Sequence, residues 1–151
     1  MADPLKSRIL EDVKDAMRAR DRARLGTLRM VTAAIKQQEV DQRTASLDDS
    51  AVVAVLEKML KQRRESVRQY ESAGREDLAS GEREEIAVIE QYMPQALGAA
   101  EIDAIIEAII EDTGAATMKD MGRVMGLLKP RVQGRADMGA VSASVRARLS
   151  G

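Results

Sequence analysis

The sequence contains no cysteine and no histidine, and these two absences remove most of the side chains from which active sites are built. Without cysteine there is no disulfide, no thiolate metal ligand and no thiol nucleophile. Without histidine the chain lacks the commonest general base and the commonest ligand of zinc, copper and non-haem iron. We therefore expect no catalytic residues of a self-sufficient enzyme, no metal site and no cofactor.

Aromatic residues are also scarce, because Phe and Trp are absent and only Tyr70 and Tyr92 supply rings. The core must be aliphatic, and the composition, rich in Ala, Leu, Glu and Arg, favours helices. No apolar run approaches the roughly 20 residues of a membrane span. The segment Met1–Ser7 lacks the apolar stretch of a secretory signal. The expectation is a cytoplasmic protein that has no membrane partner.

Four amphipathic helices are expected before Pro94, because apolar residues recur there every three or four positions. Asp21 is a suitable N-cap for the second of them. Gly74 is placed to end the third in a left-handed conformation. The residue before a proline is pushed out of the α region, so Met93-Pro94 ends the fourth. The expected helices cover residues 5–20, 22–40, 48–73 and 75–91.

The inward residues of these four helices follow from the same spacing. In the fourth helix they are Leu78, Ile86 and Ile89. In the third helix the spacing leaves open whether Met59 or Leu60 faces the core.

Three shorter helices are expected beyond Pro94. The second begins at Thr117 and Asp120, which have the spacing of a capping box, and should end before Pro130. The three helices cover residues 99–112, 117–128 and 138–149. The predicted fold is therefore all-α, with an N-terminal helical domain over residues 1–93 and a small C-terminal three-helix bundle over residues 94–151.

The C-terminal part of the chain separates its charges. Residues 98–118 contain five acidic residues and no basic one, whereas residues 119–151 contain seven basic residues and two acidic ones, a net charge of +5. Such a segment suits contacts with several phosphates. The alternative is a solvated face balanced by the neighbouring acidic helix. The candidate RNA-binding residues are Lys119, Arg123, Lys129, Arg131 and Arg135.

Gly122 and Gly126 lie four residues apart inside an expected helix, where each glycine costs about 0.5–1 kcal/mol relative to alanine. Their presence indicates a close approach, either of another helix or of an RNA backbone. Gly134 is a third candidate for such an approach and is placed to form a left-handed turn.

A second basic cluster lies in the third expected helix, and its members are Lys58, Lys61, Arg63, Arg64 and Arg68. We expect these residues to form salt bridges with the acidic helix over 75–90 rather than to bind a ligand. The glutamates of that acidic helix have no histidine beside them, so a solvated acidic face is expected instead of a metal site.

A series of short motifs runs through nearly the whole chain. They are Thr27-Leu-Arg29, Ala33-Ala-Ile-Lys36 with Glu39, Lys61-Gln-Arg-Arg-Glu-Ser66 with Gln69-Tyr70, Gly74-Arg-Glu-Asp-Leu78, Glu82 with Glu85-Ile86, Tyr92-Met-Pro94, Lys119-Asp-Met-Gly122 with Val124-Met125, and Gly134-Arg-Ala-Asp137. In this order they resemble the YqeY family, free-standing relatives of the C-terminal tail of the GatB subunit of tRNA-dependent amidotransferase. Two departures are Met138 before Gly139 and Gly98-Ala99 where a Ser or Thr cap is common.

The resemblance implies a C-terminal bundle shared with GatB, whose tail helps to hold the misacylated tRNA. It also implies tRNA, an amidotransferase or an aminoacyl-tRNA synthetase as partners. The leading hypothesis is a non-catalytic adaptor that binds folded tRNA through the basic C-terminal bundle. Because no aromatic residue follows Tyr92, recognition should rest on shape and phosphates rather than on base stacking.

Two alternatives stay open. One is a helical protein-interaction module. The other, implied by kinship alone, is an accessory role in a carbon–nitrogen ligase reaction with glutamine as amide donor, for which this chain lacks the cradle domain that carries the chemistry.

Overall fold

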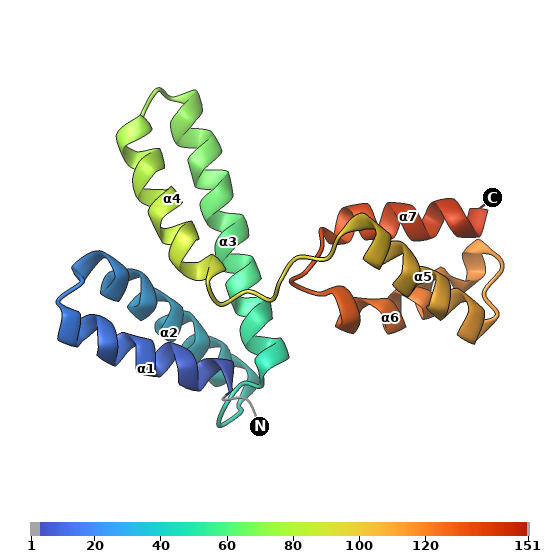
Figure 1. The fold of residues 1–151 in the computed structure, drawn as a ribbon, viewed down its shortest axis with the longest axis horizontal. Helices are drawn as coiled ribbons and strands as arrows, with labels where there is room; N and C mark the ends of the chain where they lie inside the picture. Colours follow the sequence, from blue (N-terminus) through green and yellow to red (C-terminus); the bar gives the residue numbers. More distant parts are fainter. Residues whose placement is uncertain (1–3, 151) are drawn as a thin grey trace. The chain divides into compact units, whose positions relative to one another are not determined.

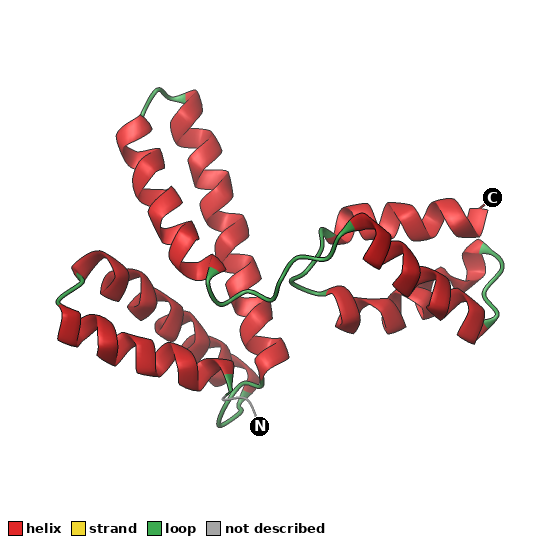
Figure 2. Ribbon diagram, viewed as in Figure 1, coloured by secondary structure: helices red, strands yellow, loops and turns green. Residues whose placement is uncertain are grey.

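The structure is a computed structural model that describes residues 4–150, and every described element is a helix or a loop (Figures 1 and 2). The predicted all-α fold is confirmed. The chain divides after Met93 into two compact units, which we call the amino-terminal and carboxy-terminal units. None of the helices in the described part of the chain combines the length and apolarity that crossing a membrane requires.

The amino-terminal unit consists of two helical hairpins (Figure 1). The first pairs α1 (Leu5–Ala19) with α2 (Arg22–Gln42), and the second pairs α3 (Asp49–Ser72) with α4 (Glu76–Glu90). The carboxylate of Asp21 accepts a hydrogen bond from the backbone N–H of Arg24, which confirms the predicted N-cap. Gly74, which follows α3, has the predicted left-handed backbone, with φ at 70°.

An aliphatic core joins the helices of the amino-terminal unit. Met59 and Leu60 are both buried, so the two alternatives for α3 are both realised. The prediction for Leu78 is wrong, since its side chain is 39% exposed while Ala79 is fully buried. Ala79 takes the buried position at this turn of α4, and the residue before it in the sequence then faces outward. The largest fully buried side chains of this core are Ile9, Leu28, Val31, Ile35, Val52, Leu56 and Ile89.

A buried carboxylate also holds the amino-terminal unit together. Glu39 is only 4% exposed, and it accepts hydrogen bonds from Lys6 Nζ at 2.6 Å and from the backbone N–H of Leu47 at 3.1 Å. The Lys6 ammonium, followed by the Leu47 amide, lowers the pKa of Glu39 below its ordinary value. Glu39 therefore ties α1, α2 and the loop before α3 to one another.

A second polar network surrounds Tyr92, which is almost fully buried. The Tyr92 hydroxyl donates to Asp12 Oδ2 at 2.6 Å, and Arg24 donates to the same hydroxyl at 3.1 Å. Arg24 also donates to Gln91 Oε1 at 2.6 Å, and the guanidinium of Arg8 lies over the Tyr92 ring. Burial, followed by the hydrogen bond to Asp12, raises the pKa of Tyr92, so the phenol stays protonated. This network links α1 and α2 to the end of α4.

The carboxy-terminal unit contains α5 (Ala99–Thr113), the short 3-10 helix η1 (Met118–Asp120), α6 (Met121–Val132) and α7 (Met138–Ser150). The capping box of Thr117 and Asp120 forms as predicted. The core is aliphatic and comprises Ile106, Ile109, Ala115, Val124, Leu128, Val132, Val141, Val145 and Leu149.

The prediction that Pro130 ends the second helix of this unit is wrong, because α6 continues through Pro130 to Val132. Val132 is fully buried, so the last turn is held by packing, while Pro130 itself is exposed. Proline leaves the carbonyl four residues earlier, at Gly126, without its usual donor. Gly126 is also exposed, so water can satisfy that carbonyl.

Candidate nucleic-acid interface

Helix α6 presents one face to the core of the carboxy-terminal unit and the other to solvent. Val124, Leu128 and Val132 are fully buried at four-residue spacing. The opposite face is exposed, and it contains Gly122, Arg123, Gly126, Leu127, Lys129, Pro130 and Arg131. Leu127 is 51% exposed although it is a large apolar residue. This face has no covering element within the described residues of its own unit.

The two helical glycines lie on this open face. A Cβ atom added at Gly122 or at Gly126 would meet no other atom within 4 Å. Close helix–helix packing, one of the two alternatives for these glycines, is therefore absent from the described structure. The surface at Gly122 and Gly126 is flat and free for an external group to approach the helix backbone.

Three of the five predicted RNA-binding residues are exposed and form no ion pair with any described residue. They are Lys119, in η1 just before α6, and Lys129 and Arg131, at the end of α6. Lys129 lies seven residues after Gly122 and three after Gly126, so it is on the glycine side of the helix. Arg131 lies four residues after Leu127, so these two residues share the part of the exposed face that is next to the glycines.

The other two predicted residues are partly engaged inside the unit. Arg123 Nη2 donates to the carbonyl of Thr113 at 3.2 Å and to Asp120 Oδ1 at 3.1 Å, so it ties the end of α5 to the start of α6. Arg135 Nε donates to the carbonyl of Gln95 at 3.0 Å. Gly134 forms the predicted left-handed turn beside Arg135, with φ at 75°. Each arginine keeps further N–H groups, and replacing either would remove a contact inside the unit.

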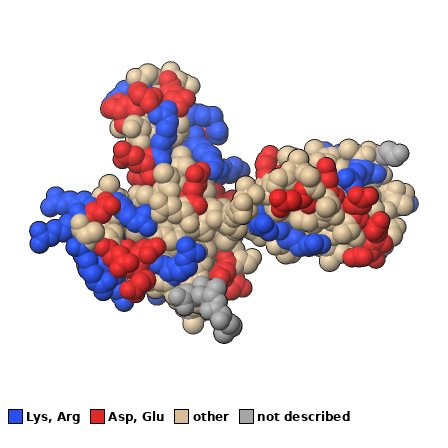
Figure 3. All heavy atoms as spheres, viewed as in Figure 1, with Lys and Arg blue, Asp and Glu red and all other residues tan. Residues whose placement is uncertain are grey.

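The charges of the carboxy-terminal unit are balanced in number and separated in space. Residues 94–151 contain seven basic and seven acidic residues, which leaves no net charge. The acidic residues gather over α5 (Figure 3), and one of them, Asp103, lies 3.7 Å from Arg148 of α7. Asp120 accepts hydrogen bonds from the backbone N–H groups of Ala116 and Thr117, which lower its pKa and keep it ionised. The cations of α6 therefore lie apart from most of the acids.

The second basic cluster behaves as the sequence predicted for two of its arginines. Arg63 Nε donates to Glu85 at 2.9 Å, and Arg64 donates to Glu90 at 3.0 Å, both across the α3–α4 hairpin. Arg68 pairs with Glu65 within α3. Figure 3 shows the acidic side chains over α4 beside basic side chains over α3. Within residues 4–150 no group of three acidic side chains is placed to hold a metal ion.

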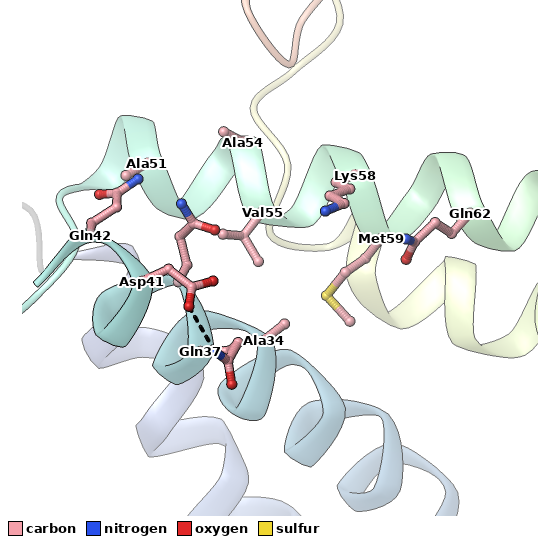
Figure 4. Close-up of a pocket in the computed structure, with 11 residues that line it drawn as sticks. Ala34, Gln37, Asp41, Gln42, Ala51, Ala54, Val55, Lys58, Met59 and Gln62 are labelled. Atoms are coloured by element: carbon pink, nitrogen blue, oxygen red, sulfur yellow. Dashed lines mark hydrogen bonds between the residues drawn. The ribbon is translucent and has the colours of Figure 1, made fainter.

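A shallow groove of about 430 Å³ lies between α2 and α3 (Figure 4). Its floor is formed by small or aliphatic residues such as Ala34 and Val55, and amide side chains line its rim. Gln37 Nε2 donates to Asp41 Oδ1 at 2.8 Å across one turn of α2. Asp41 and Lys58 are the only charged residues of its lining, and the rest are amides, alanines, Val55 and Met59, so the groove suits the binding of a surface.

Sequence reasoning missed one further set of basic residues, on α2. Arg22, Arg29 and Lys36 recur every seven residues, all three are exposed, and none forms an ion pair with a described residue. The seven-residue recurrence is visible in the sequence. The apolar stripe of the same helix is the more conspicuous pattern, and it lies on a different side.

Comparisons with known proteins agree with the motifs. The sequence model of a family described as "Yqey-like protein" matches residues 6–149. Among curated proteins, the chain is similar to "Altered inheritance of mitochondria protein 41, mitochondrial" from several fungi. The protein of Vanderwaltozyma polyspora is 32% identical over 74% of this chain and 63% of its own length. The protein of Kluyveromyces lactis is 35% identical over 68% of this chain and 56% of its own length. The chain thus spans less than two thirds of these two relatives.

The names of these relatives contradict the expected cytoplasmic location, because each is named as a mitochondrial protein. The expectation was based on the lack of an apolar signal stretch and of a membrane span. Mitochondrial targeting segments are amphipathic and rich in Arg and Ser rather than apolar. The apolar content of a chain therefore cannot separate the two compartments.

Proposed function

This chain belongs to the YqeY family, and from that premise we propose that it is a non-catalytic adaptor that binds folded tRNA through its carboxy-terminal unit. The choice of tRNA as the ligand comes from the sequence motifs, which resemble a family related to the tRNA-holding tail of GatB. The same resemblance supplies the context, which is tRNA-dependent amide transfer carried out by other subunits.

The observation that carries the proposal is the exposed face of α6. Lys129 and Arg131 are exposed cations without an ion pair in the described chain, and Gly122 and Gly126 leave open surface beside them. Phosphate contacts need cations whose charge is not already neutralised, and a backbone can approach most closely where side chains are absent. No ring lies on this face, which favours recognition of phosphates over base stacking.

The proposal is tested by fluorescence anisotropy with labelled bulk tRNA over a salt series. The variant is Lys129→Glu with Arg131→Glu, which leaves the internal ties of Arg123 and Arg135 intact. The matched control is Lys58→Glu with Lys61→Glu on α3, because these lysines are also exposed and without an ion pair among the described residues. Both double variants change the net charge by the same amount.

We expect wild-type affinity that is micromolar or tighter and falls steeply with salt. The α6 variant should bind about tenfold more weakly, whereas the control should change by about twofold or less. No binding by the wild type, or equal affinity of the α6 variant and the control, would contradict the proposal.

A second candidate function is a helical protein-interaction module, and the groove between α2 and α3 favours it. Its alanine floor and amide rim (Figure 4) would accept a polar helix of a partner such as an amidotransferase subunit or a synthetase. Ala54→Arg in this groove should then abolish partner capture without altering tRNA binding. Capture that survives the substitution would exclude the groove.

A further inference from the structure

The exposed side of α2 contains a row of cations at regular spacing, which we call the α2 row. Its members are Arg22, Arg29 and Lys36, with Arg43 one further heptad on, at the C-cap of the helix. Seven residues correspond to about 10.5 Å along a helix. The α2 row therefore runs about 31 Å from Arg22 to Arg43, the length of a small domain.

The residues between these cations are small or short. Gly26, Ala33 and Val40 lie four residues after successive members of the α2 row, and all three are exposed. A Cβ atom added at Gly26 would meet nothing within 4 Å. At Gly26 and Ala33, therefore, no large side chain separates the cations of the row.

The charge of this surface is not neutralised by neighbouring acids. Residues 22–38 contain four basic residues and no acidic one. The fourth cation, Arg24, faces inward to Tyr92 and Asp12. Two exposed acids, Asp21 and Asp41, lie at the ends of this stretch, but their carboxylates accept from the Arg24 backbone and from Gln37 and form no ion pair with the row among the described residues. Glu39 is buried and paired with Lys6. In the part of the chain that the structure describes, Arg22, Arg29, Lys36 and Arg43 have no ion pair.

A groove of about 510 Å³ lies between the middle of the α2 row and α1. Arg29 and Lys36 line it on the α2 side, and Lys6 and the 44% exposed Leu10 line it on the α1 side. Lys6, Arg29 and Lys36 outweigh the single carboxylate of Glu39, so the groove is positive. A phosphate entering it would lie between cations of two helices.

We propose that the α2 row is a second phosphate-binding surface, and that it contacts the sugar–phosphate backbone of the same folded RNA as the α6 face. The inference rests on the proposed function. Cations spaced by about a Debye length at physiological salt act as nearly independent contacts, as separate phosphates require. The row carries no ring for base stacking, so its ligand is a structured backbone rather than an unpaired strand.

An acidic protein helix is the competing occupant, and the composition of the row disfavours it. The centre of a protein interface is apolar and is usually anchored by aromatic or large aliphatic residues. Among the described residues, the row and the groove beside it offer Leu10, Met30 and Val40 as large exposed apolar side chains, and no aromatic ring. Cations separated by glycine and alanine suit phosphate groups better than they suit the apolar anchor residue of a protein partner.

The test measures binding of labelled bulk tRNA by three variants of the full chain, each with two charge reversals. They are Arg22→Glu with Arg29→Glu on the α2 row, Lys129→Glu with Arg131→Glu on α6, and the α3 control Lys58→Glu with Lys61→Glu. Thermal melting checks that each variant is folded. Arg22→Gln with Arg29→Gln, which removes charge without adding repulsion, replaces the first variant if that one is unstable.

The α2-row reversal should weaken binding about tenfold and lower the slope of log K against log salt by about 1.5–2. The glutamine variant should weaken it about threefold, and the control by about twofold or less. If the α6 reversal weakens binding and the α2-row reversal does not, the α2 row is excluded while the proposed function stands. If the wild type binds no tRNA, both fail. If the control loses as much as the α2 row, net charge alone explains binding and the row is excluded.

Discussion

The α3–α4 hairpin and the exposed sides of α2 and α6 are all rich in basic residues, but the two groups of surfaces use them differently. In the hairpin, Arg63 and Arg64 pair with glutamates of α4, and Arg83 pairs with Glu71 and Glu76. On α2 and α6, most outward cations form no ion pair within the described residues. The arginines of the hairpin are paired within the fold although Lys58 and Lys61 are not, whereas most outward cations of α2 and α6 stay unpaired among the described residues.

This difference shows that basic residues clustered in a sequence can be paired within the fold. The cluster over 58–68 has five basic residues in eleven positions, yet its arginines are paired. The α2 row is more dilute, with one cation every seven residues, yet all of them are free in the described structure. Whether a cation has a carboxylate within reach matters more than how many cations lie nearby.

The largest effect on stability is expected for Arg63, because this arginine should stabilise the fold and should not contact the ligand. Its side chain is only 13% exposed, and its Nε–H donates to Glu85. Arg63→Ala should lower the free energy of unfolding by about 2 kcal/mol, because a hydrogen-bonded carboxylate loses its partner. Chemical denaturation measures this loss, and tRNA affinity should stay within about twofold of wild type. Weaker tRNA binding at unchanged stability would assign Arg63 to the ligand surface instead.

Glu39 allows paired and unpaired charges to be compared within one helix, because it lies on the buried side of α2. Its folded pKa lies below the ordinary value of 4.5, so its contribution to stability is complete above that pH and is lost as the pH falls through the folded pKa. Glu39→Gln should therefore lower the melting temperature at about pH 7 and flatten the fall of stability in acid. Thermal melts between about pH 3 and pH 7 test this. If the stability of the variant falls with decreasing pH as steeply as that of the wild type, Lys6 and Glu39 do not form their ion pair in solution.

The glycines of α6 give a smaller effect of opposite sign. Gly126→Ala should raise the free energy of unfolding by about 0.5–1 kcal/mol, since alanine is the better helix former and its Cβ meets no other atom. Gly122→Ala should do the same. Denaturation curves of both variants provide the measurement. Destabilisation would mean that another element covers this face in solution.

The smallest effect on stability is expected for the cations of the open surfaces. The double variant Arg22→Glu with Arg29→Glu, and the double variant Lys129→Glu with Arg131→Glu, should each change the free energy of unfolding by about 0.5 kcal/mol or less. These residues have no ion pair to lose in the described chain. Urea titration measures the change. A loss comparable to that of Arg63→Ala would remove the distinction between the two groups of surfaces.

The fold could be predicted from the sequence largely because its signals are local. The N-cap at Asp21, the capping box at Thr117 and Asp120, and the left-handed Gly74 each depend on residues a few positions apart. The errors came from tertiary packing. Pro130 stays inside α6 because the buried Val132 holds the last turn, and Leu78 faces outward because the neighbouring Ala79 takes the buried position.

The candidate site was less predictable, because residues far away in the sequence decide whether a basic side chain has a partner within the fold. Arg24 lies in the same helix as the α2 row, but it is bound to Gln91 and Tyr92, at least 67 residues further on. Arg135 was expected to face a ligand, and it donates to the carbonyl of Gln95, 40 residues earlier. No local pattern distinguishes these arginines from Arg22 or Arg131, which have no such partner in the described structure.

The most direct test of this account is the salt dependence of tRNA binding by the wild type and by one variant with four reversals, Arg22→Glu, Arg29→Glu, Lys129→Glu and Arg131→Glu. If the unpaired cations of α2 and α6 hold the phosphates, the slope of log K against log salt should be about −5 for the wild type, from about six contacts. In the variant it should be about −2 or shallower. Equal slopes for the two proteins would contradict the assignment of both surfaces.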